Sequence, residues 1–222
     1  LLLFLTFPVL YLQTIMSSMR DKILNKTGEL FLNLGFKSVT MDDIASELGI
    51  SKKTLYKYFP SKAILVEASA SRLHFSVSQE INRIKKQGYN AIEEEFAVKA
   101  IFKEMFKNAK TSPMYQLKKY YPETYSNLVA REVCIFKNCN IDNLTKGIAQ
   151  GFYRPNINIE FAVNFYFTLI FGVFETEIYG NQTQELMKVE YEILEYHIRA
   201  IATEKGLKEL EKQVNSINKN HQ

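Results

Sequence analysis

Residues 35–65 read GFKSVTMDDIASELGISKKTLYKYFPSKAIL, and this stretch decides the fold of the N-terminal part of the chain. Thr40 stands three residues before Asp43, an arrangement close to a capping box, and so predicts the start of a short helix. Ser51 is the expected N-cap of the next helix, which is short because Pro60 interrupts it. A short helix, a turn that contains a glycine and a second short helix form the helix-turn-helix pattern.

The helix before this stretch is expected to run from Ser17 to Leu34. Its apolar side chains recur with helical spacing, so one stripe faces the protein interior. The stripe comprises Ile23, Thr27, Leu30, Phe31 and Leu34. Short helices bury little apolar surface, so we expect residues 17–63 to form a small helical domain that depends on the rest of the chain for stability.

The second helix of the pair combines bases with aromatic rings. In SKKTLYKYF (51–59), Leu55 and Phe59 lie four residues apart and form the inward pair. The side chains left to project outward are those of Lys52, Lys53, Thr54, Tyr56, Lys57 and Tyr58. Lysines neutralise phosphates, and tyrosine hydroxyls donate hydrogen bonds to phosphate oxygens. A nucleic-acid interface is therefore favoured over the alternative, an ordinary solvated charged face.

The charge of the chain is unevenly distributed. The whole chain has a net charge of +4, and residues 17–63 hold eight Lys and Arg against five Asp and Glu. Most of the positive excess thus lies in this segment. Because the acids at 42, 43 and 47 belong to the preceding helix, the SKKTLYKYF helix itself is purely basic.

The pattern of residues 35–65 closely resembles the N-terminal DNA-binding domain of the TetR family of bacterial transcriptional regulators. The elements that carry the resemblance are GFKSVT, the following DIA, SELGIS, KTLYKYF and PSKAIL. A weaker resemblance is GIAQGFYRPNIN (147–158), which looks like the turn that the family often places before its penultimate long helix. The resemblance implies a helix-turn-helix domain over 17–63 and a helical effector-binding and dimerisation domain over 64–204.

The resemblance also implies roles for individual residues of the helix-turn-helix. Family positions that usually contact backbone phosphates fall on Thr40, Ser51, Tyr56, Tyr58 and Lys62. Positions that most often read base edges fall on Lys52, Lys53 and Thr54. A lysine there can donate to guanine O6 or N7. Lys57 suits either role.

The rest of the chain is expected to be helical, because glycine and proline are few and no strand-like alternation persists. The expected helices cover residues 61–87, 90–109, 113–120, 122–151, 157–180 and 184–204. The predicted fold class is all-α, with an N-terminal three-helix helix-turn-helix domain and a larger helical domain. Residues 205–222 are polar and are expected to form a frayed C-terminal tail.

The resemblance places an effector pocket among the middle helices, which are rich in Phe, Tyr and Met. The candidate lining residues are Phe102, Met105, Phe106, Tyr121, Tyr125, Phe136 and Phe167. Such a lining suits a small apolar or aromatic effector. Ordinary core packing is the alternative, since core helices have the same composition.

A homodimer is the second implication for the larger domain. The family builds its dimer as a four-helix bundle from the last two long helices of each subunit, here 157–180 and 184–204. The candidate interface residues are Phe161, Phe165, Phe171, Leu186, Val189, Ile193 and Tyr196. A helix that is apolar nearly all round has to bury both of its sides, as residues 157–180 would in such a bundle.

No motif indicates an enzyme, a metal site or a cofactor. His74, His197 and His221 are scattered, and none has the spacing of metal ligands. Cys134 and Cys139 form neither a disulfide framework nor a zinc-binding pattern, which favours reduced thiols in a cytoplasmic protein. We therefore expect no catalytic residues, no metal and no cofactor.

Residues 1–16, LLLFLTFPVLYLQTIM, form an uncharged apolar segment. It lacks the basic region and cleavage site of a secretory signal, and its apolar run is shorter than the roughly 20 residues that span a bilayer. Two origins stay open: non-native sequence upstream of a start at Met16 or Met19, or an apolar arm that packs on a partner or a membrane surface. No membrane partner is expected for the remainder of the chain.

Together these patterns predict a homodimeric, ligand-responsive transcriptional regulator of the bacterial cytoplasm. It would act as a repressor on a palindromic double-stranded DNA operator and be released by a small-molecule effector. Two other classes remain open: an architectural DNA-binding dimer without an effector, and a dimeric interaction protein that has lost DNA binding.

Overall fold

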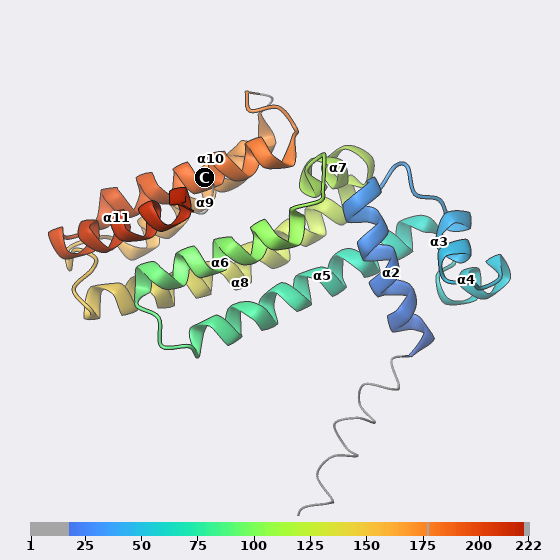
Figure 1. Ribbon diagram of the computed structural model, residues 1–222, viewed down its shortest axis with the longest axis horizontal. Coiled ribbons are helices and arrows are strands. Elements are labelled where there is room, and N and C mark those ends of the chain that lie inside the picture. Colours follow the sequence, from blue (N-terminus) through green and yellow to red (C-terminus); the bar gives the residue numbers. More distant parts are fainter. Residues whose placement is uncertain (1–17, 177, 220–222) are drawn as a thin grey trace, which may run out of the picture. The chain divides into compact units, whose positions relative to one another are not determined.

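The computed structural model describes residues 18–176 and 178–219, and the elements found there are helices (Figure 1). The predicted all-α fold class is confirmed. The helices are α2 (Met19–Leu34), α3 (Met41–Glu47), α4 (Lys52–Tyr58), α5 (Lys62–Lys85), α6 (Ala91–Phe106), α7 (Pro113–Tyr120), α8 (Pro122–Ala149), α9 (Ile159–Glu175), α10 (Thr183–Ile201) and α11 (Glu204–Lys219). The apolar segment 1–16 lies outside the described residues.

The chain divides into two compact units, residues 1–73 and 74–222. The boundary falls inside α5, beyond the residue 63 that the sequence pattern suggests. Helix α5 therefore begins in the first unit and ends in the second.

The first unit is held by local capping and a small core. The Ser18 side chain caps α2 in a capping box with Asp21, and the Asp21 carboxylate also accepts a hydrogen bond from Arg72 at 2.8 Å. Gly35 ends α2 with a φ of 91°, a conformation that favours glycine. The fully buried side chains of this core include Ile23, Phe31, Ile44, Leu55, Phe59 and Leu65.

The second unit is a stack of long helices in which α8 packs against α6, α7 and α9, and α10 packs against α9 and α11 (Figure 1). Its core includes Ile92, Phe96, Leu144, Val163, Leu194 and Ile198. None of the helices within residues 18–176 and 178–219 is long and apolar enough to cross a membrane.

The C-terminal segment differs from the predicted frayed tail. Residues Glu204–Lys219 form the helix α11, and Leu210 on it is fully buried in the core of the second unit. Leu207, Val214 and Ile217 pack against the same core. Their spacing of three, four and three residues around Leu210 places the four side chains on one helix face, which the high content of polar residues conceals.

A tight turn after α8 links this helix to the corner between α10 and α11. Tyr153 is buried, and a Cβ atom on Gly147 would lie 2.1 Å from its ring, so only glycine fits at that position. Backbone hydrogen bonds from Arg154 to Ile201 and from Thr203 to Phe152 fasten the turn. This turn corresponds to the segment GIAQGFYRPNIN of the sequence.

Candidate nucleic-acid interface and ligand cavity

The helix-turn-helix is formed by α3 and α4 and is capped as the sequence predicts. Thr40 and Asp43 form a reciprocal capping box at the start of α3. At the start of α4, the Ser51 hydroxyl accepts a hydrogen bond from the Thr54 N–H at 3.0 Å. Leu55 and Phe59 are almost completely buried, so the inward face of α4 is anchored in the core.

The outward face of α4 is open to solvent. Lys52, Lys53, Tyr56, Lys57 and Tyr58 are all exposed, and the two tyrosines retain 46% and 40% of their accessible surface. Thr54 is half-buried, and its hydroxyl lies 2.8 Å from that of Ser51. The structure thus brings together three lysines and two tyrosines on one helix of seven residues.

Lys52 is not a free cation, because an acid of α3 reaches it. The Lys52 Nζ atom lies 2.5 Å from the Asp42 carboxylate. The hydrogen bond to Asp42, together with the negative charge of that group, raises the pKa of Lys52. The purely basic helix of the sequence is therefore partly neutralised in the fold.

Thr40 and Lys62 hold the frame of the helix-turn-helix. The Thr40 hydroxyl donates to the Asp43 carboxylate at 2.8 Å, and the Lys62 ammonium donates to the Lys37 carbonyl at 3.2 Å. Partial burial lowers the pKa of Lys62, although the nearby Asp43 opposes this shift. Contact of either side chain with a phosphate would compete with these internal hydrogen bonds.

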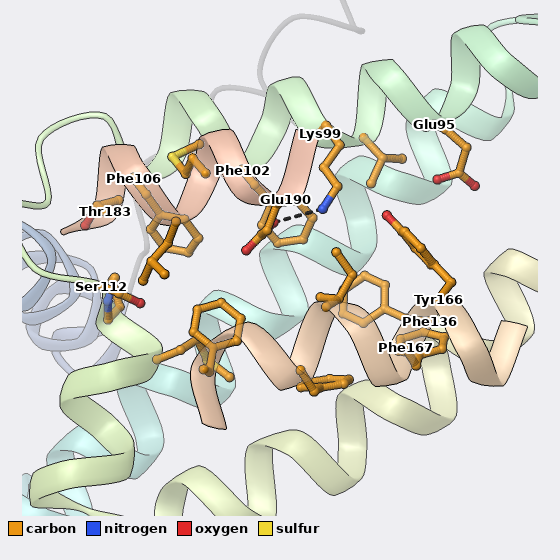
Figure 2. Close-up of a pocket in the computed structure, with 18 of the residues that line it drawn as sticks. Glu95, Lys99, Phe102, Phe106, Ser112, Phe136, Tyr166, Phe167, Thr183 and Glu190 are labelled. Carbon is orange, nitrogen blue, oxygen red and sulfur yellow. Dashed lines mark hydrogen bonds and ion pairs between the residues drawn. The ribbon is translucent and has the colours of Figure 1, made fainter. Parts of the chain in front are cut away.

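A cavity of about 170 Å³ lies within the second unit (Figure 2). Helices α6, α8, α9 and α10 and the start of α7 supply its walls. The apolar part of the lining comprises Val98, Phe102, Phe106, Pro113, Met114, Phe136, Phe167, Ile170, Phe171, Phe174, Leu186 and Met187. The polar part comprises Glu95, Lys99, Ser112, Asn140, Tyr166, Thr183 and Glu190.

Comparison with known proteins identifies the first unit. Residues 23–69 match the family described as bacterial regulatory proteins, tetR family. The first unit thus carries an N-terminal domain of the TetR family type. The resemblance carried by residues 35–65 is thereby confirmed.

Individual relatives agree with this assignment. The chain is 24% identical to the HTH-type transcriptional repressor KstR2 of Mycolicibacterium smegmatis over 67% of its length and 74% of that protein. It is 34% identical to the nucleoid occlusion factor SlmA of Glaesserella parasuis, but over 36% of this chain and 37% of SlmA. A transcriptional regulator from Cytophaga hutchinsonii has the same fold, with a TM-score of 0.65 at 21% identity over 82% of this chain and 98% of that one.

The residues expected to line a pocket fall into two groups in the structure. Phe102, Phe106, Phe136 and Phe167 line the cavity. Met105, Tyr121 and Tyr125 lie outside its lining, and the Tyr125 hydroxyl donates to the Glu175 carboxylate at 3.1 Å. Phe102 and Phe106 are one helical turn apart, so α6 presents both of them to the cavity.

The residues expected at the dimer interface differ in how exposed they are. Phe161, Phe165 and Tyr196 are exposed by 66%, 49% and 72%, whereas Val189 and Ile193 are half-buried. Phe171 and Leu186 line the cavity of their own chain, and Leu186 is buried. The structure therefore leaves an exposed aromatic group on α9 and α10 and turns two of the seven side chains inward.

Sequence reasoning missed the charged side chains of the cavity. The Lys99 Nζ atom lies 2.8 Å from the Glu190 carboxylate, and Lys99 is buried. Burial opposes the charge of Lys99, but the Glu190 carboxylate holds its pKa above the usual value. Burial also raises the pKa of Tyr166 to about 12. The sequence did contain a signal for this ion pair. Lys99 interrupts the apolar run FAVKAIF, and a lysine on a buried helix face needs an acidic partner.

Proposed function

We propose that this chain is a homodimeric transcriptional repressor that binds a near-palindromic operator and releases it when a small effector fills the cavity. The observation that carries the proposal is the outward face of α4. A helix anchored by two buried side chains and covered by exposed lysines and tyrosines is suited to enter the major groove of DNA. Binding to chromosomal DNA would place the protein in the bacterial cytoplasm.

In this proposal Lys53 contacts the edges of the bases, together with its neighbours Lys52 and Thr54. Lys53 is exposed at the start of α4, where recognition helices contact base edges. Tyr56, Tyr58, Lys57 and the N-terminus of α4 at Ser51 would contact phosphates. Thr40 and Lys62 would join them by exchanging an internal hydrogen bond for one to the backbone of DNA.

The exposed aromatic group on α9 and α10 supports a homodimer. Tyr166 and His197 stack with a centroid distance of 4.7 Å, so the two helices touch at this level. Phe165 and Tyr196 are the chain neighbours of that pair and point outward. Two subunits that cover these faces would present two recognition helices to half-sites about 34–36 Å apart.

The cavity supports control by an effector. Its lining is mainly aromatic and aliphatic with a few polar groups, which is the usual character of a small-molecule site. An effector that binds more tightly to the conformation with low DNA affinity would shift the population toward it. The difference between its affinities for the two conformations sets the loss of operator binding.

The second candidate is an architectural DNA-binding dimer without an effector, which we consider because one relative is named a nucleoid occlusion factor and not a transcriptional regulator. The 34% identity to the nucleoid occlusion factor SlmA covers 36% of the chain. Such a protein would bind DNA through the same face of α4. It would differ in that no small molecule changes its DNA affinity.

The deciding experiment is selection of bound duplexes from a random pool by the full chain, followed by titration at two salt concentrations. We expect an enriched palindrome whose binding is lost in Tyr56→Ala. Salt-dependent binding without enrichment would favour the architectural candidate. Absence of duplex binding at both salt concentrations would contradict the proposed function and favour an interaction protein that has lost DNA binding.

A further inference from the structure

The polar end of the cavity contains more negative than positive groups. Glu95, Lys99 and Glu190 are the ionisable Asp, Glu, Lys and Arg side chains of its lining. Figure 2 shows Glu95, Lys99 and the Tyr166 hydroxyl at one end, while Ser112, Thr183 and Phe106 lie at the other. Glu95 and Thr183 thus lie at opposite ends of the lining, and Glu190 lies between them.

The single cation of the lining is already neutralised. The Lys99 ammonium lies 2.8 Å from Glu190, and their side chains are exposed by 11% and 19% (Figure 2). An anionic ligand would have to displace Glu190 from Lys99. That exchange would leave the displaced Glu190 carboxylate without its partner inside the cavity, which is costly in a buried site.

The Glu95 carboxylate differs from that of Glu190 in its contacts. Within residues 18–176 and 178–219, its carboxylate makes no hydrogen bond or ion pair, although it lines the cavity and is half-buried. Burial, followed by the negative charge of Glu94, raises the pKa of Glu95 to about 7. A positive charge beside it would remove this penalty.

The cations near Glu95 are occupied elsewhere. Lys146 lies 2.6 Å from the Glu94 carboxylate, and Lys85 lies 2.9 Å from Asp142. With Lys99 bound to Glu190, none of these three lysines is free to neutralise Glu95. The charges of Lys99 and Lys85 lower the pKa of Glu95 from a distance, but neither lysine pairs with its carboxylate. A cation bound in the cavity would be a direct partner for this group.

The wall that continues from Glu95 is aromatic. Tyr166 and Phe167 have ring centroids 6.3 Å apart, and Phe167 stacks on Phe171 at 5.8 Å. On the opposite helices, Phe102 lies 6.1 Å from Phe136. Aromatic faces attract organic cations and also pack against apolar chains, so this wall suits both parts of an amphiphilic cation.

We infer that the cavity binds an elongated hydrophobic cation, with an amine or quaternary ammonium beside Glu95 and an apolar body along the aromatic wall. The role of this ligand as the effector rests on the proposed function, whereas its binding does not. Thr183, whose buried hydroxyl lacks a hydrogen-bond partner in the described part of the chain, would offer a second polar contact at the far end.

The test compares three probes of equal chain length by calorimetric titration of the full chain: octyltrimethylammonium, octanoate and 1-octanol. We expect the ammonium to bind with a Kd about tenfold or more below that of octanoate, because it alone pairs with Glu95. Glu95→Gln should remove most of this preference and leave 1-octanol binding unchanged. Glu104→Gln, an exposed acid on the same helix and outside the lining, is the matched control and should change nothing.

Equal or tighter binding of octanoate would overturn the inference, as would failure of all three probes to bind. The preference of the unsubstituted protein for octyltrimethylammonium over octanoate tests the inference by itself, even if a variant does not fold. Adding octyltrimethylammonium to the protein–operator complex separates the two proposals. Cation binding without release of DNA would contradict the effector role alone, and cation binding by a chain that binds no DNA would contradict the repressor function alone.

Discussion

The Asp42 carboxylate lies 2.5 Å from the Lys52 ammonium and so joins the two helices of the helix-turn-helix on their exposed side. Both side chains retain more than half of their accessible surface. An exposed ion pair of this kind is easily exchanged for other partners. The Asp42 carboxylate therefore competes with bases and phosphates for the Lys52 ammonium.

Replacing Asp42 by Asn should strengthen DNA binding. The substitution frees Lys52 and removes a negative charge near the phosphates, so we expect affinity for both operator and random duplex to rise about threefold or more, with a steeper salt dependence. Fluorescence anisotropy at two salt concentrations measures both effects. Glu123→Gln, which makes the same charge change at an exposed site on α8, should have little effect. Equal effects of the two variants would assign the change to net charge alone.

Lys53 and Lys57 should differ in what they contribute to DNA binding. Lys57→Ala is expected to weaken binding to all duplexes and to reduce the salt slope by about one, as for the loss of one phosphate contact. Lys53→Ala should instead change which bases are enriched at one position of each half-site. Repeating the random-pool selection with each variant measures this directly. Identical losses on operator and random DNA for both variants would refute base reading by Lys53.

Local sequence patterns predicted the helix-turn-helix well, because its features depend on residues close together in the chain. The Thr40–Asp43 capping box, the Ser51 cap and the buried pair Leu55 and Phe59 each join residues that are no more than four positions apart. The Asp42–Lys52 pair depends on how α3 meets α4, which no local pattern specifies. The sequence-based description of α4 as purely basic was therefore incomplete.

The larger unit was less predictable for the same physical reason. Its helices could be located from periodicity, but the partners Lys99 and Glu190 are 91 residues apart in the chain. An aromatic side chain on a helix apolar on all sides can face the cavity, the core or a second subunit. This explains why the sequence did not reveal that Phe171 and Leu186, which are expected at an interface, line the cavity.

The exposed aromatic group on α9 and α10 should control dimerisation. We expect Tyr196→Asp to shift the chain toward monomer, with a loss of about tenfold or more in dimer affinity, because a charge would enter the centre of the proposed interface. Sedimentation velocity over a concentration series measures the shift. Phe75→Asp changes another exposed aromatic residue, on α5, and should leave the dimer intact. An unaltered dimer in Tyr196→Asp would place the interface elsewhere.

Helix α11 should contribute to the stability of the second unit. Leu210 is fully buried, so Leu210→Ala is expected to lower the free energy of unfolding by about 3 kcal/mol through lost burial and a cavity. Chemical denaturation followed by circular dichroism provides the measurement. The exposed Lys208 on the same helix is the matched control, and Lys208→Ala should alter the unfolding free energy by less than about 0.5 kcal/mol. A frayed tail would make the two variants indistinguishable.

His197 should make the protein sensitive to acid. It retains 8% of its accessible surface and stacks on Tyr166, and burial lowers its pKa to about 4. Between about pH 6.5 and pH 4 the unfolded chain takes up a proton that the folded chain does not, so stability is full above this range and falls as the pH decreases through it. The slope should approach about 1.4 kcal/mol per pH unit.

Comparison of the unsubstituted protein with His197→Phe isolates this effect, because the ring at position 197 is retained while the titrating group is removed. Glu95 acts in the opposite sense: its folded pKa is raised to about 7, so its contribution to stability is lost as the pH rises between about 4.5 and 7. This contribution is common to both proteins and cancels in their difference. Urea unfolding at several pH values from 4 to 8 should therefore give a difference that grows toward acid, and a constant difference would show that His197 is protonated equally in both states.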